Sequence, residues 1–461
     1  MSTLEAAPQY TRLRDWDAWS KYMLFFLFGF YLIGRSFSYL GIPPAKLFIG
    51  DLTLAVFIIF RPRQLFDRWF GALTGGGPLG AFSWVLLISI VYGIFEVIRG
   101  VLSGFSPIVA LQNLVFNLYP LYFFLGLWVG ARRPELMLKV LQFFAWGLCI
   151  YGPFYYFFLH NVTITMPGSD SVTIFGQATG GAFVILGLLC LDPKPSRYWL
   201  PMTMGAVTFL VAQMRADWFG AAISFLIWGV LEKKLKRVAT FFLGLAALLL
   251  VGAILNVDLP SSSSRGGAIS TREIVARGLS AVNPELAKDL TGSEDTAMYA
   301  GTIKWREMWW HAIWENSQEN KTNLIIGPGY GFELKKLVTY LNYDIRTPHN
   351  IFYFALGYTG WVGVSIFFAL QIACVSILWR LYRVTGSAFG LAAYSATLFA
   401  AFFGNVLENP FGAIPLYCMM GLLVGPSLSA MAQPQRVRVS LGNPSRSFAD
   451  ARAFGEAYAG E

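Results

Sequence analysis

The chain has 461 residues, of which 56% are hydrophobic and only 13% are charged, and its formal net charge is +9. Soluble domains carry roughly 25% charged residues, so this composition excludes an ordinary soluble protein and indicates a polytopic membrane protein. In such a protein, basic residues first report orientation in the membrane, and nucleic acid is not a predicted partner.

Apolar segments along the chain predict an all-α fold with about twelve transmembrane helices. They lie near 22–41, 45–61, 80–98, 110–131, 136–159, 173–191, 198–214, 217–231, 239–256, 350–379, 388–407 and 412–430. The expected regions are a nine-helix part (1–256), a large loop (257–349), a three-helix part (350–430) and a disordered tail (431–461).

Lysine and arginine are distributed very unequally between the two sides of the predicted bundle. Connections on one side, with the termini, hold 21 of them, whereas the short connections on the other side hold only Lys46, Arg99 and Arg215. The positive-inside rule therefore predicts cytoplasmic termini and places the large loop on the outer face.

The large loop carries ten basic and eleven acidic residues, so it is not a basic arm. Its first part, Ser261 to Thr296, is predicted to be irregular. The run from Ala300 to Asn316 is rich in tryptophan, which favours the headgroup region, so we expect a helix on the outer membrane surface. A second amphipathic helix is predicted from the spacing of Leu334, Leu337, Val338 and Leu341.

Charged residues of the predicted spans all lie toward the outer side, so the polar pocket opens outward, which argues against a transporter. Arg35 and Asp51 lie about 9 Å deep and are expected to form an ion pair. Glu96, Arg99 and Glu408 end spans on the same side and are expected to reach water by snorkelling.

His349 directly precedes the tenth span and is one of three histidines in the chain. A neutral imidazole can act as a base, a metal ligand or a capping group, and no second histidine or cysteine lies at ligand spacing. His160 and His311 are interpreted as interfacial residues. The turn Gly327-Pro-Gly-Tyr-Gly lacks the lysine of a nucleotide-binding loop, so a tight turn is favoured, although its amides could approach a phosphate.

Three segments in this order resemble the O-antigen ligase and polymerase superfamily. They are Gln213-Met-Arg-Ala-Asp-Trp-Phe-Gly, Lys304-Trp-Arg-Glu-Met-Trp, and Gly327-Pro-Gly-Tyr-Gly followed by Pro348-His-Asn and Gly360-Trp-Val-Gly. In that family an arginine follows the span before the loop, a second precedes an aromatic helix, and a histidine and asparagine open the next span. The matching residues are Arg215, Arg306, His349 and Asn350. The family commonly has serine where this chain has Met214.

The resemblance implies a GT-C-like glycosyltransferase of the bacterial inner membrane, without metal or cofactor. It moves a glycan from a polyprenyl diphosphate, such as undecaprenyl diphosphate, to a sugar hydroxyl of a lipid A core on the periplasmic face. Arg215 and Arg306 are expected to neutralise the diphosphate, because guanidinium groups bind it bidentately. His349, with an ordinary pKa of about 6.5, is the expected base.

Five residues are further candidates for substrate binding: Asn350, Gly327, Gly329, Arg35 and Trp305. Asn350 can instead cap the span, and the capping role is favoured. A polysaccharide polymerase of the same superfamily differs only in its acceptor, and the sequence does not separate it from a ligase. A lipid-linked sugar flippase would need polar residues at the midplane, and a scaffold would not depend on the arginines and the histidine.

Overall fold

Helices account for most of the described residues in the computed structural model. The structure describes residues 13–42, 47–160, 162–165, 171–173, 175, 180–260, 268–280, 283–291, 295–338 and 347–428. The predicted tail at 431–461 lies outside these residues.

The α-helices and the minor elements follow in chain order. The helices are α1 (Ala18–Leu32), α2 (Arg35–Ser38), α3 (Ile49–Phe60), α4 (Pro62–Gly75), α5 (Gly77–Leu102), α6 (Pro107–Leu118), α7 (Tyr122–Arg132), α8 (Leu136–Phe154), α9 (Gly181–Leu191), α10 (Trp199–Val211), α11 (Arg215–Leu231), α12 (Leu235–Ile254), α13 (Thr271–Leu279), α14 (Pro284–Thr291), α15 (Asp295–Gln318), α16 (Lys321–Ile326), α17 (Ile351–Thr385), α18 (Phe389–Ala401) and α19 (Pro410–Val424). Single turns are η1 (Leu13–Asp15), η3 (Tyr119–Leu121), η4 (Tyr155–Leu159), η5 (Pro195–Tyr198), η6 (Leu334–Val338) and η7 (Gly425–Ser427). Three antiparallel ribbons pair β1 (Gly41–Ile42) with β2 (Leu47–Phe48), β3 (Thr163–Thr165) with β4 (Ser171–Thr173), and β5 (Asp258–Pro260) with β6 (Ala268–Ser270).

Each apolar segment predicted from the sequence overlaps a helix. In the described part of the chain, six helical stretches are long and apolar enough to cross a membrane: 77–102, 107–132, 136–159, 235–254, 351–385 and 410–427. Helices α3, α9 and α18 are apolar but shorter. The fold is therefore helical with several candidate spans, and the prediction of about twelve is confirmed only to that extent.

Two of the candidate spans present large apolar side chains to the surroundings. On α5 the side chains of Trp84, Val91 and Ile98 are exposed, and on α12 those of Leu243 and Ile254 are exposed. Contiguous apolar surfaces of this kind are uncommon on soluble monomers. Their presence fits helices that face lipid.

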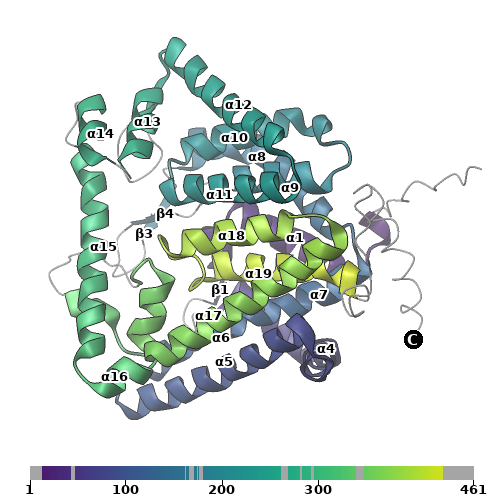
Figure 1. The fold of residues 1–461 in the computed structure, drawn as a ribbon, viewed down its shortest axis with the longest axis vertical. Coiled ribbons are helices and arrows are strands. Elements are labelled where there is room, and N and C mark those ends of the chain that lie inside the picture. Colours follow the sequence, from purple (N-terminus) through teal and green to yellow (C-terminus); the bar gives the residue numbers. More distant parts are fainter. Residues whose placement is uncertain are drawn as a thin grey trace, which may run out of the picture.

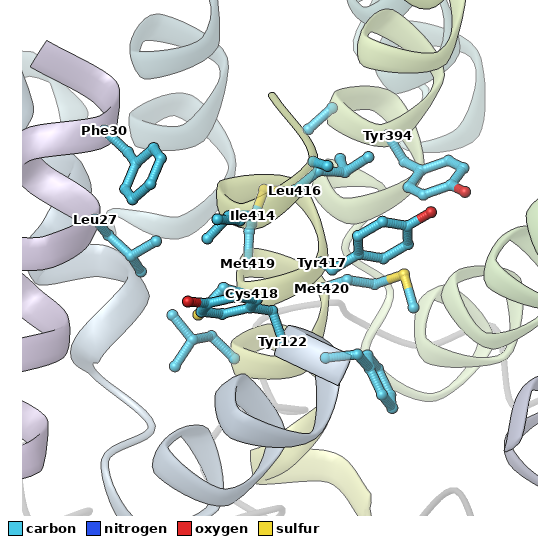
Figure 2. Packing of buried hydrophobic residues seen from close by; sticks show 14 of the residues in the cluster. Leu27, Phe30, Tyr122, Tyr394, Ile414, Leu416, Tyr417, Cys418, Met419 and Met420 are labelled. Atoms are coloured by element: carbon cyan, nitrogen blue, oxygen red, sulfur yellow. The ribbon is translucent and has the colours of Figure 1, made fainter. Parts of the chain in front are cut away.

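Helix α19 lies in the centre of the bundle, and Figure 2 shows its side chains pointing toward neighbours on several sides. Glycines allow α7 and α19 to approach closely, as is typical of membrane helices. A Cβ atom on Gly130 would lie 2.6 Å from the carbonyl oxygen of Leu422, and one on Gly421 would lie 2.6 Å from the amide nitrogen of Leu127. Larger residues at these glycines would separate the two helices.

Helix α4 was not predicted, because its segment is too polar for a span. Its buried residues Leu65, Trp69 and Ala72 lie at i, i+4 and i+7, and Pro62 occupies its first turn. This spacing is the signature of an amphipathic helix, so the signal was present in the sequence.

Helices α13 to α16 form a layer across one end of the bundle, and α15 runs nearly perpendicular to α5, α11 and α18 (Figure 1). A helix is thus present over the predicted tryptophan-rich run, and its place on a membrane surface stays a prediction.

One of two further predictions for this layer is wrong. The region from Ser261 to Thr296, predicted to be irregular, contains α13 and α14. The side chain of Ser270 caps α13 by accepting from the amide of Glu273 over 3.2 Å, a Ser-x-x-Glu signal that the sequence carried. The second amphipathic helix is predicted from Leu334 to Leu341; its described part is the short turn η6, and residues 339–346 lie outside the described residues.

Helix α17 is broken at Gly360, which has φ 59° and ψ −162°. Such a conformation is essentially restricted to glycine. The break separates a first segment, residues 351–359, from the long remainder of α17. His349 lies just before this first segment, so the break helps to decide where the imidazole lies.

Candidate active site

His349 and Trp305 bring the start of α17 into contact with α15. Their rings are perpendicular, with centroids 5.7 Å apart. His349 has φ 54°, a left-handed conformation that is uncommon for a residue other than glycine. Unusual backbone conformations of this kind occur often at functional sites. The imidazole is thus held beside α15 by a backbone turn that most residues avoid.

Arg306 follows Trp305 on α15 and reaches the connection between α18 and α19. One of its Nη atoms donates a hydrogen bond to the carbonyl oxygen of Phe403 over 3.0 Å. Its Cζ atom lies 5.4 Å from the centroid of the Trp305 ring. The same tryptophan therefore contacts both the guanidinium and the imidazole.

Arg215 begins α11, and its guanidinium donates to Ser280 Oγ over 3.0 Å. The Ser280 hydroxyl donates in turn to the carbonyl of Arg277 over 2.9 Å, which ties α11 to the end of α13. Gln213, two residues before Arg215, has φ 51°. Of the four non-glycine residues with positive φ in the described ranges, one is His349 itself and another, Gln213, lies two residues before Arg215.

Helices α11 and α18 run antiparallel, and this decides where the two arginines lie. At one end the amide of Ala388 donates to Glu232 Oε1 over 2.8 Å. Toward the other end the rings of Phe219 and Phe399 are 6.5 Å apart. The start of α11 therefore lies beside the end of α18, where Phe403 accepts the hydrogen bond from α15. We call Arg215, Arg306 and His349 the basic cluster: Arg306 and His349 share the contact with Trp305, and Arg215 begins α11 at the same end of the α11–α18 pair.

The amides of the glycine turn are bonded to protein. Gly327 donates to the Asn323 carbonyl over 3.0 Å, and Gly329 donates to the Tyr358 carbonyl over 3.0 Å. The next amide, that of Tyr330, donates to the Glu96 carbonyl over 3.3 Å. Approach of these amides to a phosphate would require breaking those bonds, so the structure favours a tight turn at Gly327 and Gly329.

The expected ion pair between Arg35 and Asp51 is absent, and this prediction is wrong. Within the described residues, no salt bridge joins the two. Asp51 accepts from the amide of Phe48 over 3.0 Å at the start of α3. Arg35 is exposed, and its Cζ atom lies 5.7 Å from the Tyr39 ring. The carboxylate satisfies a free helix amide, which needs no cation.

Asn350 is the N-cap of α17. Its side-chain oxygen accepts from the amides of Phe352 and Tyr353 over 2.9 and 3.3 Å. The residue is 8% exposed. Its contacts match the capping alternative and leave the substrate-binding interpretation without direct support.

Two other tryptophans of α15 donate hydrogen bonds to backbone carbonyls of neighbouring segments. Trp309 is buried and donates to the Leu334 carbonyl over 3.1 Å. Trp310 donates to the Pro348 carbonyl over 2.8 Å, directly before His349. The sequence shows that this segment is rich in tryptophan, but it does not predict these hydrogen bonds. Every residue has a backbone carbonyl, so residue types do not reveal which carbonyl accepts.

The prediction that Glu96 and Glu408 reach water by snorkelling is wrong, because both side chains are buried. Glu96 is fully buried and forms an ion pair with Arg99. Glu408, in the connection between α18 and α19, is 9% exposed. Neither oxygen of Glu408 has a hydrogen-bond partner among the described residues, and burial raises its pKa from 4.5 to about 8. Burial without a hydrogen-bond partner among the described residues therefore favours the protonated form of Glu408.

One apolar groove, of about 340 Å³, lies between α1 and α3. Its lining contains none of the predicted site residues: Ala18, Trp19, Tyr22, Ile49, Leu52, Thr53 and Val56. Within the ranges described, no three His, Cys, Asp or Glu side chains gather closely enough to hold a metal ion. The basic cluster instead offers guanidinium and imidazole groups, which suit anionic or hydroxyl-bearing ligands.

No model of a known protein family matches this sequence, and no curated protein matches it.

Proposed function

We propose that this protein is a glycosyltransferase that moves a glycan from a polyprenyl diphosphate to an acceptor sugar hydroxyl. The observation that supports it most is the contact of Trp305 with both Arg306 and His349, at the end of α11 where Arg215 begins. Arg306 and His349 thus share one aromatic contact, and the proposal adds Arg215 from the adjoining start of α11. This is the combination that a diphosphate leaving group and a hydroxyl nucleophile require.

In the proposed reaction, the acceptor oxygen attacks the anomeric carbon and the bond from that carbon to the diphosphate oxygen breaks. The hydroxyl proton passes to His349, and the electron pair leaves with the diphosphate. Arg215 and Arg306 neutralise the developing charge, because a guanidinium remains protonated and presents paired donors. The diphosphate leaves already charged, so the scheme assigns it no general acid.

The site faces the periplasm of a bacterial inner membrane in this proposal, and both termini are cytoplasmic. The excess of basic residues on the other side of the predicted bundle supports that orientation. The position of α15 across the helix ends supports a layer at the outer surface (Figure 1). About twelve crossings remain part of the proposal.

The test is transfer by the purified full-length protein in lipid vesicles, supplied with a polyprenyl diphosphate glycan and a core-type acceptor. A new glycosidic product with released polyprenyl diphosphate is the expected result. Product on the core acceptor identifies a ligase, and extension of the donor glycan identifies a polymerase. Movement of donor across sealed vesicles without a new bond would refute the transferase and support a flippase.

A further inference from the structure

The break in α17 frees backbone carbonyls that neighbouring segments then bind. In an unbroken helix, the carbonyls of Tyr358 and Thr359 would accept from amides four residues later. Here Gly329 donates to the Tyr358 carbonyl over 3.0 Å, and the Tyr92 hydroxyl donates to the Thr359 carbonyl over 2.9 Å. The glycine turn and α5 therefore satisfy the groups that the break exposes, as a broken membrane helix requires.

The glycine turn fits into the break because both sides lack side chains. A Cβ atom on Gly360 would lie 2.6 Å from the Gly327 amide nitrogen and 2.6 Å from the Ile325 carbonyl oxygen. On the opposite side of the turn, a Cβ atom on Gly329 would lie 3.2 Å from the Cα atom of Gly100 on α5. The turn is thus held between α5 and α17.

Arg99 of α5 fastens the turn in this position. One Nη atom donates to the Gly327 carbonyl over 2.8 Å and the other donates to the Ile326 carbonyl over 2.6 Å. The second Nη atom is also paired with the buried carboxylate of Glu96. We call this arrangement of Glu96, Arg99 and the two carbonyls the Arg99 clasp. It uses the planar fork of arginine, which a lysine cannot reproduce.

We propose that Glu96 and Arg99 are positioning residues. They hold the first segment of α17, residues 351–359, and His349 directly before it, against α15. The inference rests on the proposed function only for its effect on transfer, since the contacts themselves are structural. The clasp fixes the turn, the turn fills the break at Gly360, and the break orients residues 351–359. In this scheme Glu96 and Arg99 act on His349 through the backbone of residues 351–359.

The test compares a double variant, Glu96→Gln with Arg99→Met, with the single variant Arg99→Lys and the control Arg63→Met. The double change removes both charges, because loss of Arg99 alone would leave a buried carboxylate unpaired. Arg63 is an exposed residue of α4 and no part of the clasp. Two properties are measured on the full-length protein: hydrogen exchange of residues 351–359, and kcat and KM for transfer.

We expect the double variant to exchange residues 351–359 faster than the control. We also expect a kcat about 100-fold lower, because a misplacement of about 1 Å can cost that factor, with donor KM within about twofold. Arg99→Lys should fall between the double variant and wild type. Unchanged exchange, or faster exchange with unchanged kcat, would overturn the inference. If wild type transfers no glycan but the variants still loosen residues 351–359, the proposed function fails and the structural part of the inference remains.

Discussion

The rings of Trp305 and His349 meet at right angles with their centroids 5.7 Å apart, although 43 residues separate them along the chain (349 minus 305, less one). The contact joins α15, in the layer formed by α13 to α16, to the start of α17. It also places Arg306, the neighbour of Trp305, in the same region as the imidazole. Substitutions at His349 and Arg306 therefore test the two residues that Trp305 brings together.

Replacing His349 with alanine should lower transfer by about 10²- to 10⁴-fold, because that is the usual contribution of a general base. The matched control is His311→Ala, since His311 lies on α15 and its exposed side chain pairs with Glu315 at 3.3 Å. Transfer rates of both purified variants provide the measurement. Equal rates for the two variants would remove His349 from the mechanism.

Changing Arg306 to lysine should impair transfer although the charge is kept. A lysine ammonium cannot bind the Phe403 carbonyl and a phosphate oxygen with the same planar fork. We expect a loss of at least about tenfold in kcat/KM, or about 1.4 kcal/mol of transition-state stabilisation. The control Lys304→Arg changes an exposed residue of the same helix. A wild-type rate for Arg306→Lys would contradict bidentate binding at this position.

Gly360→Ala should destabilise the protein by about 3 kcal/mol or more. The new Cβ atom would lie 2.6 Å from the Ile325 carbonyl oxygen, and the backbone conformation is one that alanine avoids. Gly244→Ala on α12 is the control, because nothing lies within 4 Å of the position of its Cβ atom. Thermal unfolding in detergent compares the two. If both variants melt alike, the break at Gly360 carries little strain.

Asn350→Ala should cost about 1 kcal/mol of stability, the usual value of an N-cap. Asn350→Asp should retain both stability and transfer, since a carboxylate oxygen can accept from the same two amides. Thermal unfolding and transfer rates of the two variants are the measurements. A stable Asp variant that has lost transfer would instead indicate that the amide contacts substrate.

Glu408 should make stability fall as the pH rises from about 4.5 to about 8. Its pKa is about 8 in the folded protein and 4.5 ordinarily, because burial disfavours the carboxylate. In this window the unfolded chain releases a proton that the folded protein keeps, which favours unfolding by about 1.4 kcal/mol per pH unit. Glu408→Gln does not titrate, so its unfolding temperature should fall less between pH 5 and pH 8. Parallel curves for the two proteins would exclude this effect.

Much of the architecture follows from local sequence patterns. Apolar runs predicted the helices of the bundle, and tryptophans in the loop predicted α15, because helix formation and burial depend on nearby residues. The capping signal from Ser270 to Glu273 and the amphipathic spacing of α4 are equally local, and they indicate α13 and α4. The candidate residues of the basic cluster came from motif order alone.

Which of these residues meet was decided by tertiary structure. The sequence shows Arg35 and Asp51 at equal depth, but only packing reveals that Asp51 caps α3 instead. It shows Arg99 at the end of a span, but not that two distant carbonyls accept its hydrogen bonds. Composition and periodicity determine which face of each helix is apolar and therefore buried, because residues three or four positions apart lie on the same face. Hydrogen bonds between segments depend on the break at Gly360 and on how the helices pack, which no local pattern encodes.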